Sequence, residues 1–297
     1  MIRVAYKVDN AIIMAAGTAS RFAPISYEMP KALIEVKGEV LIERQIRQLQ
    51  EAGIKEIIVV VGYKKEQFYY LKDKFNVILI ENKEYLSRNN NGSIFAVREY
   101  LKNSYICSSD NYFSINPFET QVDDSYYAAV YSKGRTLEWC MSEDDEGFID
   151  SVTVGGSDTW YMLGHTFWSE KFSKTFLGIL DTVYHLNETK DKLWEKIYIE
   201  HLDELKMKMR RYGQNEIFEF DTLDELRLFD TSYVENTRSQ IIKEVASKLS
   251  SKECEITDLI AYKTENNSAA GFYFKINQNK YRYDYETKEM EQLKCLN

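Results

Sequence analysis

Short apolar runs alternate with helical periodicity over roughly the first 110 residues. Residues 10–15 (NAIIMA) and 56–62 (EIIVVVG) are continuous apolar runs, as expected of strands covered on both faces of a sheet. Between them, Ile42, Ile46 and Leu49 recur at spacings of four and three before Gly53, which predicts an amphipathic helix with a glycine cap. The order β-α-β-α-β-α-β predicts a doubly wound α/β sheet that binds ligands beyond the carboxyl ends of its strands. The remaining elements expected in this part are helices at 64–74 and 93–101 and strands at 77–80 and 105–108.

After residue 110 the apolar segments become shorter, and apolar and polar positions alternate more often within them. This change indicates a mixed or antiparallel insertion that forms a lid or the second half of a cleft. Strands are expected at 126–132, 139–142, 148–154, 160–168 and 217–220, and helices at 170–184, 191–205 and 222–229.

The last sixty or so residues predict a small separate module. In a hairpin expected at 272–285, Phe272, Phe274 and Ile276 alternate with polar positions. A helix at 240–249 and a strand at 256–262 would complete an α+β unit with a three-stranded sheet, which is marginal on its own. We therefore expect two domains, residues 1–235 and 236–297. The second, whose role the sequence leaves open, should pack on the first or on a second subunit as a homodimer contact.

Composition excludes several classes of protein. The 297 residues carry a net charge of −9, and no stripe of Lys and Arg could follow a phosphate backbone, so nucleic acid is not expected as a partner. The four cysteines are irregularly spaced and predict reduced thiols. Arg3 and Lys7 interrupt any apolar signal core, and no apolar run could span a bilayer. We expect a cytoplasmic protein without membrane insertion.

Residues 15–31 (AAGTASRFAPISYEMPK) contain the most informative motif. Small residues after a strand let a nucleotide approach the backbone, whose N–H groups can bind phosphate oxygens. Arg21 offers a forked donor to phosphates, and Lys31 adds a second positive charge. The spacing is neither that of a P-loop nor that of a Gly-x-Gly-x-x-Gly fingerprint, and taken alone it is also typical of an ordinary turn.

The same stretch resembles the Ala-Gly-x-Gly-x-Arg and Pro-Lys motif of nucleotidyltransferases, and most closely the bacterial CTP:phosphocholine cytidylyltransferases of the LicC type. Further matches in order are VGYKKEQFYYLKDKF (61–75), NNNGSIFAV (89–97), SSDNYF (108–113), LEW (137–139) and NEIFEFDTLDELRLF (215–229). The resemblance implies a Rossmann-like, GT-A-like mixed sheet with helices on both faces. It covers roughly residues 10–230 and leaves out the C-terminal module.

The resemblance implies Mg²⁺-dependent transfer of CMP from CTP to a small phosphorylated acceptor, with phosphocholine first, giving CDP-choline and pyrophosphate. Arg21 would hold the β- and γ-phosphates, and Lys31 the α-phosphate and the acceptor phosphate. Asp110, in Ser-Asp-Asn, and Asp221, in Phe-Asp-Thr, would bind Mg²⁺, as one or two carboxylates with phosphate oxygens suit this ion. Nucleotide contacts would come from Ala15, Ala16, Gly17, Thr18, Ala19, Ser20, Arg21, Gly62, Asn91 and Ser93.

Three of these positions carry an alternative. Ala19 replaces the second glycine of the family motif, and its methyl group narrows the choice of φ. Asp221 could cap the following helix, but Thr222-Leu223-Asp224-Glu225 fits a capping box that would leave its carboxylate for the metal. Asp110 could form an Asx-turn with Asn111.

The acceptor residues are less defined. Aromatic faces hold quaternary ammonium groups, and the family's tryptophan corresponds to Trp139. A family tyrosine corresponds to Leu193, a loss that Trp194, Tyr131 or Trp160 could compensate if they are not simply core residues. Arg88 could pair with an acidic group on the acceptor or be an ordinary solvated side chain.

Other functions remain open on the sequence. The same chemistry could act on phosphoethanolamine, 2-aminoethylphosphonate, a phosphorylated amide or a sugar 1-phosphate. A catalytically idle nucleotide-binding regulator is the alternative from a different class, although such a protein would not need Lys31 and both carboxylates.

Overall fold

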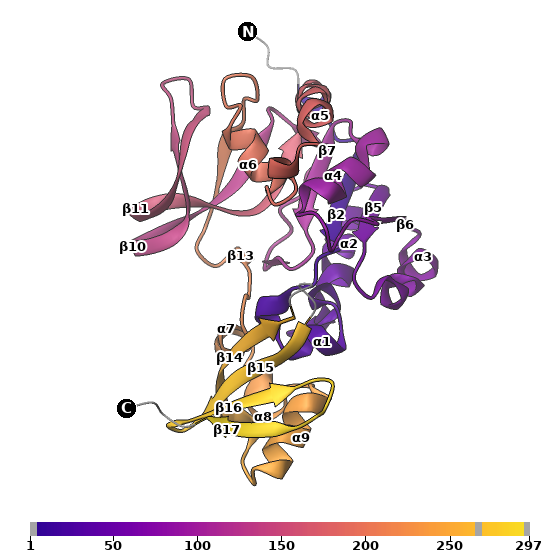
Figure 1. The fold of residues 1–297 in the computed structure, drawn as a ribbon. Helices are drawn as coiled ribbons and strands as arrows, with labels where there is room; N and C mark the ends of the chain where they lie inside the picture. The colour runs from indigo at the N-terminus through magenta and orange to yellow at the C-terminus, as the bar shows by residue number, and fades with distance from the viewer. Residues whose placement is uncertain (1–4, 265–268, 294–297) are drawn as a thin grey trace. The chain divides into compact units, whose positions relative to one another are not determined.

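The central strand β5 (Glu56–Val61) is buried on both faces, since its neighbouring residues Ile57 and Ile58 are 1% and 0% exposed. In the computed structural model, which describes residues 5–264 and 269–293, this strand lies in a seven-stranded sheet of order β12-β10-β11-β7-β2-β5-β6 (Figure 1). The other strands of this sheet are β2 (Asn10–Ala15), β6 (Ile78–Glu81), β7 (Ser104–Ser108), β10 (Tyr126–Glu143), β11 (Ile149–Trp168) and β12 (Lys208–Tyr212).

The sheet is mixed because it combines strands from the two parts of the sequence. Strands β2, β5, β6 and β7 come from the part before residue 110, and β10, β11 and β12 come from the part after it. Strand β2 pairs in parallel with β5 and β7, and β5 pairs in parallel with β6, which confirms the doubly wound first half. Strand β11 runs antiparallel to β7 and to β10, while β10 and β12 are parallel. The carboxyl ends of β2, β5 and β7 therefore share one edge.

The insertion is built from two long strands, so the prediction of four short ones is wrong. Strands β10 and β11 pair through several register shifts, and Gly134 and Gly155 have positive φ in the bent part. Cys140 pairs with both Thr153 and Tyr161, so the ribbon curls back on itself. A ladder that tolerates bulges can continue through glycines that break the sequence pattern.

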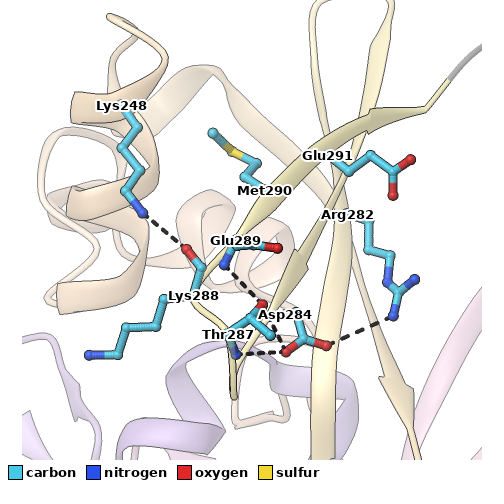
Figure 2. Close-up of a pocket in the computed structure, with 8 residues that line it drawn as sticks. All are labelled: Lys248, Arg282, Asp284, Thr287, Lys288, Glu289, Met290 and Glu291. Carbon is cyan, nitrogen blue, oxygen red and sulfur yellow. Dashed lines mark hydrogen bonds and ion pairs between the residues drawn. The ribbon is translucent and has the colours of Figure 1, made fainter.

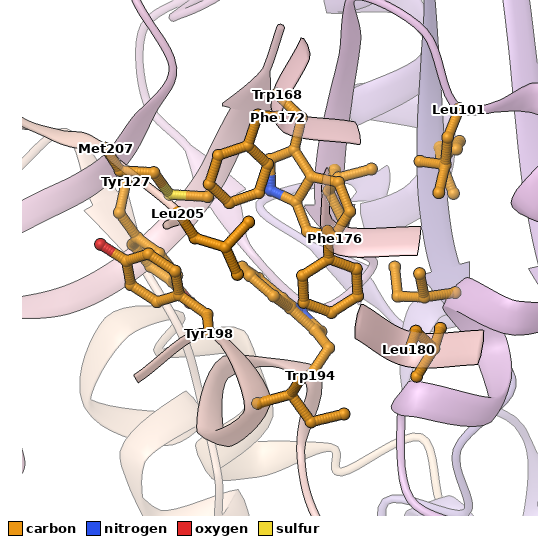
Figure 3. Close-up of a cluster of buried hydrophobic side chains, with 14 of the residues drawn as sticks. Leu101, Tyr127, Trp168, Phe172, Phe176, Leu180, Trp194, Tyr198, Leu205 and Met207 are labelled. Atoms are coloured by element: carbon orange, nitrogen blue, oxygen red, sulfur yellow. The ribbon is translucent and has the colours of Figure 1, made fainter. Parts of the chain in front are cut away.

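Aromatic side chains fill the core on one face of the sheet (Figure 3). Trp168 lies 5.0 Å from the ring of Trp194 and 4.6 Å from that of Phe176, with all three nearly or fully buried. The helix expected at 191–205 is much shorter. The helices of this part are α2 (Leu41–Glu51), α3 (Tyr70–Phe75), α4 (Asn91–Ala96), α5 (Glu170–Val183) and α6 (Trp194–Ile199).

The chain divides into two compact units that differ from the predicted domains. Unit 1 comprises Met1–Gly17 and Leu41–Glu219, and unit 2 comprises Thr18–Val40 and Phe220–Asn297. Unit 2 therefore combines the motif after Gly17 with the C-terminal elements. The domain boundary at residues 235 and 236 stays a prediction, as does the homodimer contact.

Unit 2 contains a four-stranded antiparallel sheet of order β14-β15-β16-β17, one strand more than predicted. Phe272 and Phe274 are fully buried in it, as their alternation with polar residues predicts. Its helices and turns are η1 (Ser20–Phe22), α1 (Ile25–Glu28), η2 (Lys31–Leu33), α7 (Leu223–Phe229), α8 (Ser232–Glu235), α9 (Gln240–Lys248) and η6 (Glu253–Glu255). The strands of this sheet are β14 (Ile256–Lys263), β15 (Ala269–Ile276), β16 (Asn279–Asp284) and β17 (Met290–Leu293).

Short strand pairs complete the two units. They are β1 (Tyr6–Lys7) with β9 (Gln121–Val122), β8 (Tyr112–Phe113) with β13 (Ile217–Phe218), and β3 (Glu35–Val36) with β4 (Glu39–Val40).

The cysteines behave as the sequence predicts where the structure describes them. Cys107, Cys140 and Cys254 are free thiols, and burial raises the pKa of Cys107 and keeps it protonated. Cys295 lies outside the described residues. Over residues 5–264 and 269–293, no helix has the length and apolar character needed to cross a bilayer.

Candidate active site

The nucleotide loop begins in unit 1, directly after strand β2. Ala15 ends the strand, and the carbonyl oxygen of Ala16 accepts a hydrogen bond of 3.1 Å from the Tyr63 amide. A Cβ on Gly62 would lie 2.9 Å from the Ala16 oxygen and 2.8 Å from the Tyr85 ring, so only glycine fits there. Gly17 has open space around its own Cβ position. Gly62 thus holds the start of the loop against the end of β5.

The loop continues in unit 2, where Ala19 takes the conformation that glycine would adopt. Ala19 has φ 45° and ψ 45°, in the left-handed region, and precedes the 3₁₀ turn η1 that carries Arg21. The side chain of Arg21 is 75% exposed and lies 2.5 Å from the Asp221 carboxylate. The loss of the second motif glycine therefore leaves a strained alanine.

Replacing Ala19 by glycine is expected to stabilise the protein. A left-handed alanine costs about 1–2 kcal/mol, whereas glycine loses about 0.5–1 kcal/mol more conformational entropy on folding. The free energy of unfolding should thus rise by about 0.5–1 kcal/mol, measured by urea unfolding. Ala246→Gly, within α9 of the same unit, is the control and should lose about 1 kcal/mol or more. An Ala19→Gly variant as destabilised as the control would contradict the strain.

Lys31, the first residue of η2, is a buried cation. Its side chain is 6% exposed, and Nζ lies 3.8 Å from Oδ1 of Asp221 and 5.9 Å from the Phe22 ring centroid. A buried ammonium group requires an anionic partner or ligand. Arg21, Lys31 and Asp221 therefore form one charged cluster within unit 2.

The carboxylate of Asp221 is not used to cap helix α7. Thr222 accepts the Glu225 amide, and the Glu225 carboxylate accepts the amides of Asp221 and Thr222 at 2.7 and 3.2 Å. The predicted capping box is confirmed. The Asp221 side chain, 33% exposed, faces the two cations instead.

Asp110 lies in unit 1, in the turn between β7 and β8. The amide of Ser109 donates to the Met14 carbonyl at 3.3 Å, which ties this turn to the end of β2. Asn111 is 2% exposed, and its side-chain amide donates to Glu219 at 3.3 Å. Asp110 thus stands at the shared carboxyl edge of the parallel strands, the ligand-binding edge of such sheets.

The sequence predicts that Asp110 and Asp221 bind a divalent metal together with substrate. No group of three or more His, Cys, Asp and Glu side chains within 5–264 and 269–293 could hold a metal by protein ligands alone. Hard divalent ions such as Mg²⁺ are commonly held by one or two carboxylates together with phosphates. Asp110 and Asp221 are carboxylates of this kind, and their role as metal ligands stays a prediction.

Asn91 and Ser93 make structural contacts in unit 1. The side-chain amide of Asn91 donates to the carbonyl oxygens of Thr189 and Lys192 at 2.9 and 2.5 Å. The Ser93 hydroxyl accepts from Asn82 at 3.2 Å. These three bonds anchor helix α4, and the expected contacts of Asn91 and Ser93 with base and ribose stay a prediction.

Two of the proposed acceptor residues are packed into the protein. Trp194 is 1% exposed and stacks on Tyr127, so we correct its assignment from acceptor site to core (Figure 3). The Arg88 side chain is 5% exposed, with its guanidinium 3.8 Å from the Tyr184 ring centroid and 3.2 Å from Glu84. It is therefore not the solvated side chain that the sequence allowed.

Trp139 and Tyr131 lie on β10 and are partly exposed. Trp139 pairs across the ribbon with Val154, and the Tyr131 ring meets Trp160 edge to face at 5.3 Å. Leu193, in place of the family tyrosine, precedes helix α6 as its N-cap. The acceptor role of Trp139 and Tyr131 stays a prediction.

The structure reveals an acidic aromatic cluster in unit 1 that sequence reasoning missed. The Glu195 carboxylate accepts from Asn90 at 3.0 Å and from the Tyr127 hydroxyl at 3.4 Å. Burial and the charges of Glu195 and Glu219 raise the pKa of Tyr127. Burial and the charges of Glu138 and Glu219 raise that of Tyr161. The acidic aromatic cluster consists of Tyr127, Tyr161, Glu138, Glu195 and Glu219.

Glu195 is expected to make stability fall with rising pH. Desolvation raises its pKa from 4.5 to about 7, so the folded chain binds this proton more tightly than the unfolded chain. Stability is lost as pH rises between these two values. Glu195→Gln, which can still accept from Asn90, should be more stable than wild type by about 3 kcal/mol at pH 8 and equal to it at pH 4.

Urea unfolding of both proteins across this pH range measures the difference. The exposed Glu188→Gln is the matched control and should follow the wild-type profile. Parallel profiles for Glu195→Gln and wild type would show that Glu195 titrates normally.

A hollow of about 710 Å³ lies in unit 2, beside the turn between β16 and β17 (Figure 2). Lys248 donates to the Lys288 carbonyl at 3.0 Å, and Asp284 accepts from Tyr262 and from the Thr287 amide. Its lining carries both signs of charge and includes none of the predicted site residues. We assign no function to it.

Comparison with known proteins agrees with the fold. Residues 11–113 match the MobA-like NTP transferase domain. The chain is 36% identical over 218 residues to a choline-phosphate cytidylyltransferase of Streptococcus pneumoniae, covering 73% of this chain and 95% of that protein. It is 37% identical over 234 residues to a 2-aminoethylphosphonate cytidylyltransferase of Lancefieldella rimae, covering 77% and 95%.

A solved structure of CTP:phosphocholine cytidylyltransferase from Streptococcus pneumoniae matches with a TM-score of 0.73 and 34% identity, over 76% of this chain and 99% of that one. The fold and the motif at the sheet edge thus define a nucleotidyltransferase. Within that class, the chain belongs to the cytidylyltransferase family of these relatives, and about a quarter of it lies outside the matched length.

Proposed function

We propose that the chain transfers CMP from CTP to phosphocholine, with Mg²⁺ as its metal, releasing pyrophosphate and CDP-choline. The observation that carries this proposal is the cluster of buried Lys31, exposed Arg21 and Asp221 on the loop that the cytidylyltransferase relatives share. Bringing two anionic phosphates together costs about 4 kcal/mol per unit-charge pair at 4 Å and a dielectric of 20. Lys31 and Arg21 would offset this repulsion.

The reaction we propose is an in-line displacement. An oxygen of the acceptor phosphate attacks the α-phosphorus of CTP, and the bond from that phosphorus to the bridging oxygen of pyrophosphate breaks. Lys31 would stabilise the charge on the α-phosphate, and Arg21 would hold the leaving phosphates. Mg²⁺ bound through Asp110 and Asp221 would supply positive charge to the phosphate oxygens. The acceptor needs no general base, because its phosphate is ionised at neutral pH.

The acidic aromatic cluster supports an acceptor with a cationic head. Carboxylates together with aromatic rings suit an ammonium group. The hydrogen bond from Asn111 to Glu219 connects this cluster to the turn that carries Asp110. A primary amine acceptor, 2-aminoethylphosphonate, is the second candidate, because one relative carries that name and Leu193 removes an aromatic ring.

A panel of acceptors with CTP tests the assignment. The purified chain is assayed for pyrophosphate with phosphocholine, phosphoethanolamine, 2-aminoethylphosphonate and glucose 1-phosphate, and kcat/KM is compared. We expect the highest value for phosphocholine and the lowest for glucose 1-phosphate, which has no cationic head. A higher value for 2-aminoethylphosphonate would replace the proposed acceptor with the second candidate. A preference for glucose 1-phosphate would contradict both.

A further inference from the structure

The C-terminal elements share a compact unit with the phosphate-binding part of the loop. Unit 2 joins Thr18–Val40, which carries Arg21 and Lys31, to Phe220–Asn297. The relatives match 73–77% of this chain, so the chain has a segment that they do not cover. The C-terminal elements contact the loop that carries Arg21 and Lys31, and these contacts indicate what the C-terminal elements do.

The middle of the loop, between Arg21 and Lys31, is held by two C-terminal elements. The ring of Tyr27 stacks on that of Tyr285 with centroids 3.7 Å apart and planes 11° apart. The carboxylate of Glu28 accepts the amide of Ile241 at 3.0 Å, in the first turn of helix α9. A carboxylate at this end of a helix satisfies an amide that has no partner within the helix and is favoured by the helix dipole.

The loop is also contacted on either side of Tyr27 and Glu28. Strand β14 lies against the turn η1 that contains Arg21. After Lys31, the Arg238 guanidinium donates to the Glu35 carbonyl at 3.3 Å. The segment carrying both cations is therefore fixed before, between and after them.

The helix that follows Asp221 is attached to the same module. Arg227 in α7 is 8% exposed and donates to the carbonyl oxygens of Glu253 and Ile256, both at 2.7 Å. The amide of Asp258 donates to Asp224 at 3.1 Å. The C-terminal module thus contacts the turn that carries Arg21, the residues just before Lys31, and the helix that follows Asp221.

We propose that the C-terminal module is a built-in clamp that positions Arg21 and Lys31, with Tyr285 and Glu28 as positioning residues. This inference rests on the proposed function for what the cations do. A phosphate site acts only when its donors are preorganised, and a displacement of 1 Å can lower a rate by about 10²-fold.

The test uses the full chain and compares Tyr285→Ala and Glu28→Ala with wild type. Each is expected to lower kcat/KM for CTP by about 10- to 100-fold, with KM for the acceptor changed less than about twofold. Tyr285→Phe keeps the ring stack and Glu28→Gln keeps an acceptor for Ile241, so both should restore most of the activity. Tyr281→Ala removes a ring that stacks on Phe274 in the same hairpin and is the matched control. It should leave kcat/KM for CTP near wild type.

Hydrogen–deuterium exchange separates this inference from the proposed function. Amides of residues 18–33 should exchange faster in Tyr285→Ala and Glu28→Ala than in wild type and Tyr281→Ala, whether or not the chain transfers CMP. Wild-type exchange over 18–33 and wild-type kcat/KM for CTP in both alanine variants would overturn the clamp. Absence of cytidylyl transfer by the wild-type chain would instead overturn the proposed function.

Discussion

Replacing Lys31 by alanine is expected to lower kcat for cytidylyl transfer by about 10²–10³-fold, with a much smaller loss of CTP affinity. Negative charge at the α-phosphate and the attacking oxygen builds up most in the transition state, where a fixed ammonium in a 6% exposed position interacts most strongly. Steady-state kinetics give kcat, and calorimetric titration with CTP gives the dissociation constant.

Lys243→Ala, on the exposed face of α9, is the matched control. It removes one positive charge from the same unit and should leave both quantities at wild-type values. Equal losses of kcat and CTP affinity in Lys31→Ala would show that Lys31 contributes uniform binding rather than transition-state stabilisation.

Replacing Asp221 by asparagine is expected to lower activity by about 10³-fold and to weaken its dependence on divalent metal. The substitution keeps the shape of the side chain while removing the charge shared with Arg21 and Lys31. Helix α7 should be retained, because Thr222 and Glu225 form its cap. Activity is measured against Mg²⁺ concentration.

Asp258→Asn is the control for this change. It removes a carboxylate from the same unit that pairs with Lys275 at 2.7 Å on the surface, a contact of small energetic weight. Its Mg²⁺ titration should coincide with that of wild type. A wild-type Mg²⁺ titration in Asp221→Asn would remove Asp221 from the metal site.

Elements with strong local patterns could be predicted from the sequence. Strand β2 occupies the expected residues 10–15, and helix α2 buries the expected stripe of Ile42, Ile46 and Leu49, because an apolar run or stripe determines which face is buried. Helix α6 is shorter than its periodicity suggests. The carbonyl oxygens of Thr189 and Lys192 bind the Asn91 side chain, so tertiary hydrogen bonds hold this stretch outside the helix.

The candidate site also has a part that the sequence predicts and a part that it does not. The positions of Arg21, Lys31, Asp110 and Asp221 follow from motifs that are continuous in sequence. The acidic aromatic cluster could not be predicted, since its members come from β10, β11, α6 and the end of β13, and only folding brings them together. Arg88 and Trp194 carry functional residue types, yet their packing against Tyr184 and Tyr127 depends on neighbours that the sequence does not reveal.

The central claim is tested most directly by pyrophosphate release from CTP. The purified full chain is mixed with Mg²⁺ and CTP, and pyrophosphate is followed before and after phosphocholine is added, with CDP-choline identified by mass spectrometry. We predict little release before the addition, rapid release after it, and one CDP-choline formed per pyrophosphate. Absence of acceptor-dependent release with phosphocholine and with each other acceptor of the panel would contradict the account and favour a nucleotide-binding protein without catalytic activity.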